Sequence, residues 1–108
     1  MSEWRLDLPH HAEAVYKAVV YMAERGEPFE LYVNYREQKI RVEKHTPARS
    51  PHLIITFMSD GVRIRVNGRI AKEDAERIFM AALTSKLALF SALEKFIQLP
   101  LLIDITVW

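Results

Sequence analysis

Two stretches of the sequence decide the fold: FELYVNYREQKIRVE at residues 29–43 and LIITFMSDGVRIRV at residues 53–66. In both stretches apolar side chains alternate with polar ones, which is the period of a strand that buries one face. A polar segment interrupts each stretch near its middle. Each stretch is therefore predicted to form a β-hairpin.

The residues at the turns predict how the strands of each hairpin pair. A turn at Glu37-Gln38 places Tyr35 opposite Ile40 and Val33 opposite Val42. Because side chains in a strand alternate between faces, this even-length turn puts both apolar sets on the same face.

The second hairpin has a stronger turn signal. Asp60-Gly61 suits a two-residue type I′ turn, in which both positions need positive φ. Such a turn pairs Phe57 with Ile64 and Ile55 with Val66, again on one face. The other face of this hairpin then carries Thr56 and Met58 opposite the arginines of residues 63–65.

The flanking segments complete the expected topology. Residues 3–8 alternate like a strand, and apolar residues spaced by three and four predict a helix over residues 10–25 with Gly26 as a left-handed C-cap. A longer helical pattern covers residues 71–98, and residues 101–108 alternate again. The order β-α-β-β-β-β-α-β predicts a single α+β domain over residues 1–108. We expect a two-layer sandwich with two helices on one face of a mostly antiparallel sheet of about six strands.

Composition narrows the class of protein. The chain has 108 residues, 15 basic and 14 acidic side chains and no cysteine, so disulfide scaffolds, thiolate zinc sites and cysteine nucleophiles are excluded. The first residues do not resemble a signal peptide, and no uncharged apolar run reaches the ~18 residues of a membrane span. We therefore expect a soluble cytoplasmic domain without a membrane partner. Few amide residues and many charged ones are compatible with a thermophilic source.

The second helical pattern is too long for a domain of this size. About 25 residues rising 1.5 Å each span about 37 Å, whereas the whole domain should be about 35 Å across. The helix must therefore break, cross the sheet diagonally or overhang into a partner. Lys86 also falls in the middle of its apolar arc. A break at Thr84-Ser85, with the hydroxyl capping a new helix, would also rotate Lys86 outward. The alternatives are a partner carboxylate for Lys86 or a functional amine.

The end of this pattern is apolar around about half its circumference. An exposed apolar surface of this kind is typical of an interface, so we expect a homo-oligomer. The alternative is a helix buried centrally within one chain. The expected interface residues are Leu87, Leu89, Phe90, Leu93, Phe96 and Ile97.

The residue types that carry catalysis or bind metals form no convincing pattern. The four histidines lack the i, i+4 spacing of a helical zinc site, and the acids near residue 74 suit the first turn of a helix. No nucleophile motif or glycine-rich phosphate loop is present. We expect no catalytic residue, metal or cofactor.

One cluster of polar residues suggests a binding function. If the helices cover the apolar face of the sheet, the other face gathers cations around an aromatic ring, a combination that suits single-stranded nucleic acid. Arg49, in the loop between the two hairpins, would extend this cationic surface. The alternatives are a solvated face and burial against another subunit. The candidate nucleic-acid-binding residues are Tyr32, Asn34, Arg36, Lys39, Arg41, Arg63 and Arg65.

The leading hypothesis is therefore a non-enzymatic, self-associating binding or assembly module that contacts single-stranded nucleic acid through this basic face. The alternative is a small-ligand-binding protein or enzyme with a site at a subunit interface, where Lys86 would be the ionisable group. A purely structural subunit of a larger complex is the third reading.

Overall fold

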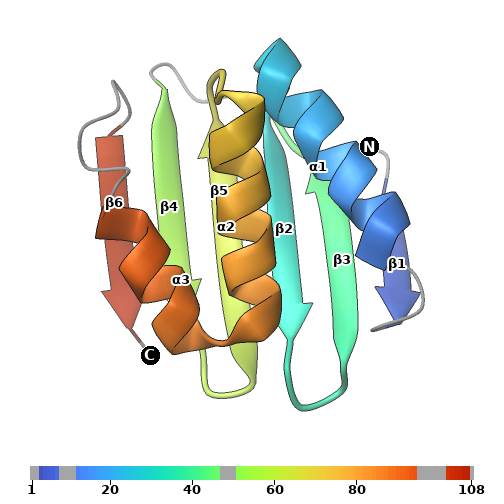
Figure 1. Ribbon diagram of the computed structural model, residues 1–108, viewed down its shortest axis with the longest axis vertical. Helices are drawn as coiled ribbons and strands as arrows, with labels where there is room; N and C mark the ends of the chain where they lie inside the picture. The colour runs from blue at the N-terminus through green and yellow to red at the C-terminus, as the bar shows by residue number, and fades with distance from the viewer. Residues whose placement is uncertain (1–2, 8–11, 47–50, 95–101, 108) are drawn as a thin grey trace.

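The computed structural model describes residues 3–7, 12–46, 51–94 and 102–107, and for residues 3–7 and 102–107 it describes the course of the backbone only. In these segments the chain forms one sheet with helices packed against it (Figure 1). The elements are β1 (Glu3–Asp7), α1 (Ala12–Arg25), β2 (Phe29–Asn34), β3 (Lys39–Lys44), β4 (His52–Phe57), β5 (Gly61–Asn67), α2 (Lys72–Thr84), α3 (Lys86–Leu93) and β6 (Leu102–Val107).

The strands lie in the order β1-β3-β2-β5-β4-β6. The four central strands, β3-β2-β5-β4, are antiparallel to one another, and the pairing of β2 with β5 joins the two hairpins. At the edges, β1 runs antiparallel to β3, whereas β6 runs parallel to β4. All three helices lie on the same face of the sheet in Figure 1.

The core fills the space between the helices and this face. Alternate residues of the central strands are almost fully buried there, among them Leu31, Ile40 and Ile64, each at most 1% exposed. Phe79 of α2 and Met22 of α1 are the largest side chains packed over them. Alternation in the sequence therefore predicted the buried face correctly.

The predicted fold class needs correction in its elements. The fold is α+β, but three helices rather than two cover the sheet in the described part of the chain. The part of the sheet whose side chains are described consists of the four central, antiparallel strands. The last strand, β6, pairs with β4 in parallel. The third helix exists because the second helical pattern breaks.

This break lies at Ser85, where the sequence predicted it. Ser85 is extended and its hydroxyl accepts a hydrogen bond from the Ala88 backbone N–H at 3.0 Å, which is an N-cap for α3. An unbroken helix of about 37 Å would exceed the longest dimension of the fold, 33 Å. The predicted C-cap of α1 is also confirmed, because Gly26 has φ +71°.

The predicted registers of both hairpins are wrong by two residues. Val33, not Tyr35, lies opposite Ile40, and Phe57 lies opposite Val62 rather than Ile64. Each turn is centred one residue earlier than predicted: the first loop covers residues 35–38, and the second turn is centred on Ser59-Asp60 rather than on Asp60-Gly61. A shift of two leaves every side chain on its predicted face, so alternation alone does not detect it.

The turn of the second hairpin differs from the predicted type I′ turn. The Met58 N–H donates to the Gly61 carbonyl at 2.8 Å, so the turn is centred on Ser59-Asp60. Gly61 is not among the residues with positive φ. Its small size is needed because a Cβ there would lie 2.1 Å from the Val33 carbonyl oxygen of the neighbouring strand β2.

Candidate nucleic-acid interface

The polar side chains of β2, β3 and β5 lie on the face that the described helices leave uncovered. They occupy the strand positions between the buried apolar residues, so they point away from the core. Six of the seven candidate nucleic-acid-binding residues have positions on these strands. They are Tyr32, Asn34, Lys39, Arg41, Arg63 and Arg65.

Tyr32 lies at the centre of this face between two arginines. It pairs directly with Arg41 of β3 on one side and with Arg63 of β5 on the other. The guanidinium carbons lie 5.1 Å (Arg41) and 5.8 Å (Arg63) from the centroid of the Tyr32 ring, within the range of cation–π contacts. We call these three residues the Arg-Tyr-Arg row.

The Tyr32 hydroxyl is held by the turn between β4 and β5. It donates to Asp60 Oδ1 at 3.3 Å, and Asn34 Nδ2 donates to Asp60 Oδ2 at 3.4 Å. Burial, followed by the nearby Asp60 carboxylate, raises the pKa of Tyr32 above its usual value, although both arginines oppose this shift. The ring is therefore a neutral and well-positioned aromatic surface at physiological pH.

Carboxylates neutralise part of the positive charge. Glu30, whose side chain is only 11% exposed, lies 2.7 Å from Arg63 Nε and 3.7 Å from Arg65 Nε. Arg41 Nε lies 3.1 Å from Glu43 Oε1. Asp60 adds a further negative charge beside Tyr32. The face therefore carries less net positive charge than the alternation of arginines and lysines alone suggests.

Two of these arginines use their Nε atoms to pair with carboxylates, but the alignment of these contacts is poor. The Nε atoms of Arg41 and Arg63 are buried, and neither makes an aligned hydrogen bond within the described part of the chain, although each lies close to a carboxylate oxygen. A buried donor without an aligned acceptor is unfavourable.

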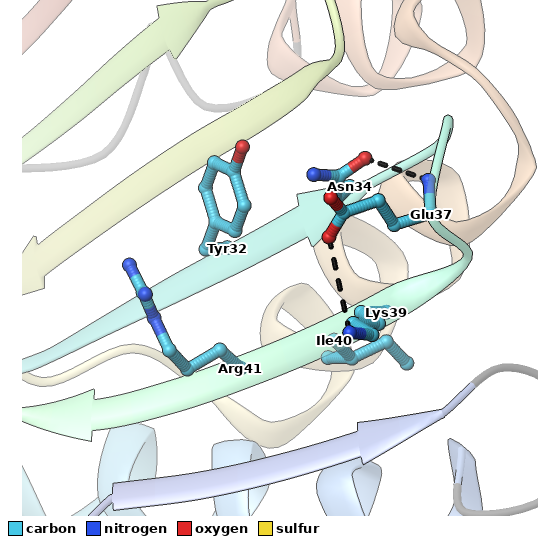
Figure 2. Close-up of a pocket in the computed structure, with 6 residues that line it drawn as sticks. All are labelled: Tyr32, Asn34, Glu37, Lys39, Ile40 and Arg41. Atoms are coloured by element: carbon cyan, nitrogen blue, oxygen red, sulfur yellow. Dashed lines mark hydrogen bonds and ion pairs between the residues drawn. The ribbon is translucent and has the colours of Figure 1, made fainter.

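A pocket of about 160 Å³ lies beside Tyr32 on the same face. Figure 2 shows Tyr32 and Arg41 on one side of it and the turn that joins β2 to β3 on the other. On the turn side the Asn34 side-chain oxygen accepts a hydrogen bond from the Glu37 N–H at 2.9 Å, and the Lys39 ammonium lies 3.9 Å from the Glu37 carboxylate. Charged groups of both signs therefore line the pocket.

The remaining candidates of the basic face are placed differently. Arg36 is exposed on the turn after β2, where its backbone N–H donates to the Asp60 carbonyl at 3.4 Å. Arg49 lies outside the described residues. The sequence did not predict that Glu37 and Asp60 would take part in this face. Both belong to turns, and strand alternation predicts nothing about the direction of turn side chains.

The expected oligomer interface divides into buried and exposed residues. Leu89 and Leu93 pack into the core of the same chain. Leu87 is 82% exposed, and Phe90 is 48% exposed while stacking on Phe57 with ring centroids 5.0 Å apart. Phe96 and Ile97 lie outside the described residues.

Lys86 has a structural role in this fold. Its ammonium donates a hydrogen bond to the Met58 carbonyl oxygen at the end of β4. This contact links the start of α3 to the turn between β4 and β5. The ammonium of the partly buried Lys86 therefore has a backbone partner within the same chain.

Other classes of site are not evident in the described residues. They contain no group of three or more histidine or acidic side chains arranged to hold a metal ion. No described helix is both long enough and apolar enough to cross a membrane. Comparisons with protein-family models, curated proteins and solved structures found no match.

Proposed function

We propose that this protein is a non-enzymatic binding module that holds single-stranded nucleic acid on the helix-free face of its sheet. The observation that carries the proposal is the Arg-Tyr-Arg row. An aromatic ring flanked by guanidinium groups on an open sheet offers a surface for base stacking and donors for phosphates. The partial exposure of the Arg63 and Arg41 side chains, 37% and 29%, supports the proposal because a phosphate can approach both guanidinium groups.

The balance of charge on this face sets the expected strength of binding. Because Glu30 and Glu43 neutralise part of the cluster, we expect contact with about three phosphates rather than with a long tract. Each phosphate contact on a single strand contributes about −0.7 to the slope of log K against log salt concentration. The expected slope is therefore about −2.

Binding of a fluorescein-labelled 12-nucleotide DNA strand, followed by fluorescence anisotropy from 50 to 300 mM NaCl, tests the proposal. Affinity should fall with a slope of about −2. Arg41→Gln should weaken binding and make the slope shallower by about 0.7. Arg77→Gln is the matched control, because Arg77 pairs with Asp74 at 3.6 Å on helix α2 and should not contact the ligand.

Two results would contradict the proposal. One is the absence of binding at 50 mM salt by a protein shown to be folded by circular dichroism. The other is an equal loss of affinity in both variants, since this would mean that net charge matters and the location of the charge does not.

A second candidate function, self-association through α3, has its own observation. Leu87 and Phe90 expose apolar surface on a helix whose Leu89 and Leu93 are already buried in the core. A second copy of the chain would remove this surface from water. Light scattering coupled to gel filtration tests the idea, because a dimer should become a monomer in Leu87→Ser. A monomeric wild-type protein at 100 µM would exclude it.

A further inference from the structure

The pocket beside Tyr32 has the size and the chemistry of a site for one nucleobase. Its volume of about 160 Å³ is close to the 150 Å³ of an engineered protein cavity that admits one benzene ring. A single six-membered ring therefore fits, whereas a purine adds a second ring. The site favours a pyrimidine on grounds of size.

The polar groups around the pocket distinguish between the pyrimidines. Glu37 provides a carboxylate, which accepts hydrogen bonds, while Lys39 and Arg41 provide donors. Cytosine carries an exocyclic amino group that donates; the adjacent ring nitrogen N3 and the carbonyl oxygen O2 beyond it both accept. Thymine and uracil present the acceptor O4 in place of the amino group, so a carboxylate at that position repels them.

We propose that this pocket is a base-binding subsite that prefers cytosine to thymine or uracil. The proposal rests on the proposed function, because the strand must lie on this face for a base to enter. The cytosine amino group donates to the Glu37 carboxylate. Lys39 or Arg41 donates to the acceptors of the ring, and Tyr32 and the Arg41 guanidinium flank the base on one side.

The accessibility of the pocket limits the preference. The side chains of Glu37 and Lys39 are each 60% exposed, so water competes for their hydrogen bonds. A well-formed base contact discriminates by roughly fivefold or more, and we expect the lower end of that range here.

The test compares labelled dC12 and dT12, which have equal length and charge, by anisotropy at pH 7.5 and 50 mM NaCl. The wild-type protein should bind dC12 about fivefold more tightly than dT12. In Glu37→Gln this ratio should fall to about one, because an amide accommodates either base by presenting its oxygen or its nitrogen. A strand of dA12 should bind less tightly than dC12, since the volume of the pocket matches one ring better than two.

Glu13→Gln is the matched control. Glu13 lies on α1, across the sheet from the pocket, with its side chain 84% exposed and 3.6 Å from the Lys17 ammonium. This variant has the same change of charge and should keep the wild-type ratio.

The outcomes separate the subsite from the proposed function. Equal binding of dC12 and dT12 by the wild-type protein would overturn the cytosine site and leave binding on this face intact. A ratio that survives Glu37→Gln would overturn the assigned role of Glu37, and tight binding of dA12 would overturn the argument from size. Failure of all three strands to bind would overturn the proposed function and the subsite together.

Discussion

Replacing Glu30 with glutamine should change stability and nucleic-acid affinity in opposite directions. Glu30 is the most buried carboxylate of the polar face, and it lies between Arg63 and Arg65. Glutamine keeps the size of the side chain but removes the charge that holds the two guanidinium groups. The variant therefore weakens the folded protein and adds positive charge to the binding face.

The magnitude of each effect follows from the geometry. Exposed ion pairs contribute about 0–1 kcal/mol and breaking a buried pair costs about 3–5 kcal/mol. Glu30 is 11% exposed but its partners are 37% and 49% exposed, so we expect a loss of about 2 kcal/mol in unfolding free energy. In a domain of this length, that loss lowers the melting temperature by about 9 °C.

The affinity should rise because Arg63 gains the freedom to contact a phosphate. The gain in affinity from one additional phosphate contact scales as the salt concentration to the power −0.7. Relative to 1 M salt, this gain amounts to about eightfold at 50 mM. Thermal denaturation measures the first effect and the anisotropy titration measures the second. Glu13→Gln on α1, on the opposite side of the sheet, should alter neither quantity appreciably.

A variant that melts earlier but binds no better would refute this reasoning. Such a result would mean that the charge beside Arg63 does not influence the ligand, and hence that the ligand lies elsewhere. Unchanged melting would instead show that the ion pairs of Glu30 contribute nothing to the fold.

Four further predictions concern the packing of the helices. Ser85→Ala should lower the unfolding free energy by about 1 kcal/mol, or the melting temperature by about 4 °C, because α3 loses its N-cap. The control Ser91→Ala, at an exposed site on α3, should have little effect on the melting temperature. Tyr35→Phe should lower the urea unfolding free energy by about 1 kcal/mol because its hydroxyl no longer donates to the Ala82 carbonyl of α2; an unchanged value would contradict the assigned contact. Burial raises the pKa of Tyr35 above 10.0, so the neutral phenol favours the fold below pH 10 and stability should fall as the pH rises through the folded pKa. Tyr35→Phe should make that alkaline decline less steep. Lys86→Met should destabilise by about 1 kcal/mol in the same assay and leave nucleic-acid affinity unchanged, whereas a loss of binding would favour a functional amine.

The faces of the sheet were predictable from the sequence, but the residue pairs across it were not. Alternation assigned Tyr32 and Arg41 to one face correctly, since a side chain in a strand has only two directions to point. The register depended on the exact positions of two turns, and each turn is centred one residue earlier than predicted. In the predicted register Tyr32 would lie opposite Glu43, and the Arg-Tyr-Arg row would not form.

The contacts between β2 and β5 had no local signal at all. They bring Arg63 beside Tyr32 and Arg65 beside Glu30, although each pair is more than 30 residues apart in sequence. Such pairing depends on how two complete hairpins pack together. The break before α3, in contrast, was predictable because helix length and the position of Lys86 are local properties.

A titration of the isotopically labelled protein with dC12, followed by NMR, tests the central claim most directly. Binding on the helix-free face predicts chemical-shift changes in the amides of β2, β3 and β5 and in the Nε signals of Arg41 and Arg63. The amides of α1 and the first half of α2 should stay unchanged. Shifts confined to the helices, with those arginine signals unmoved, would contradict the account.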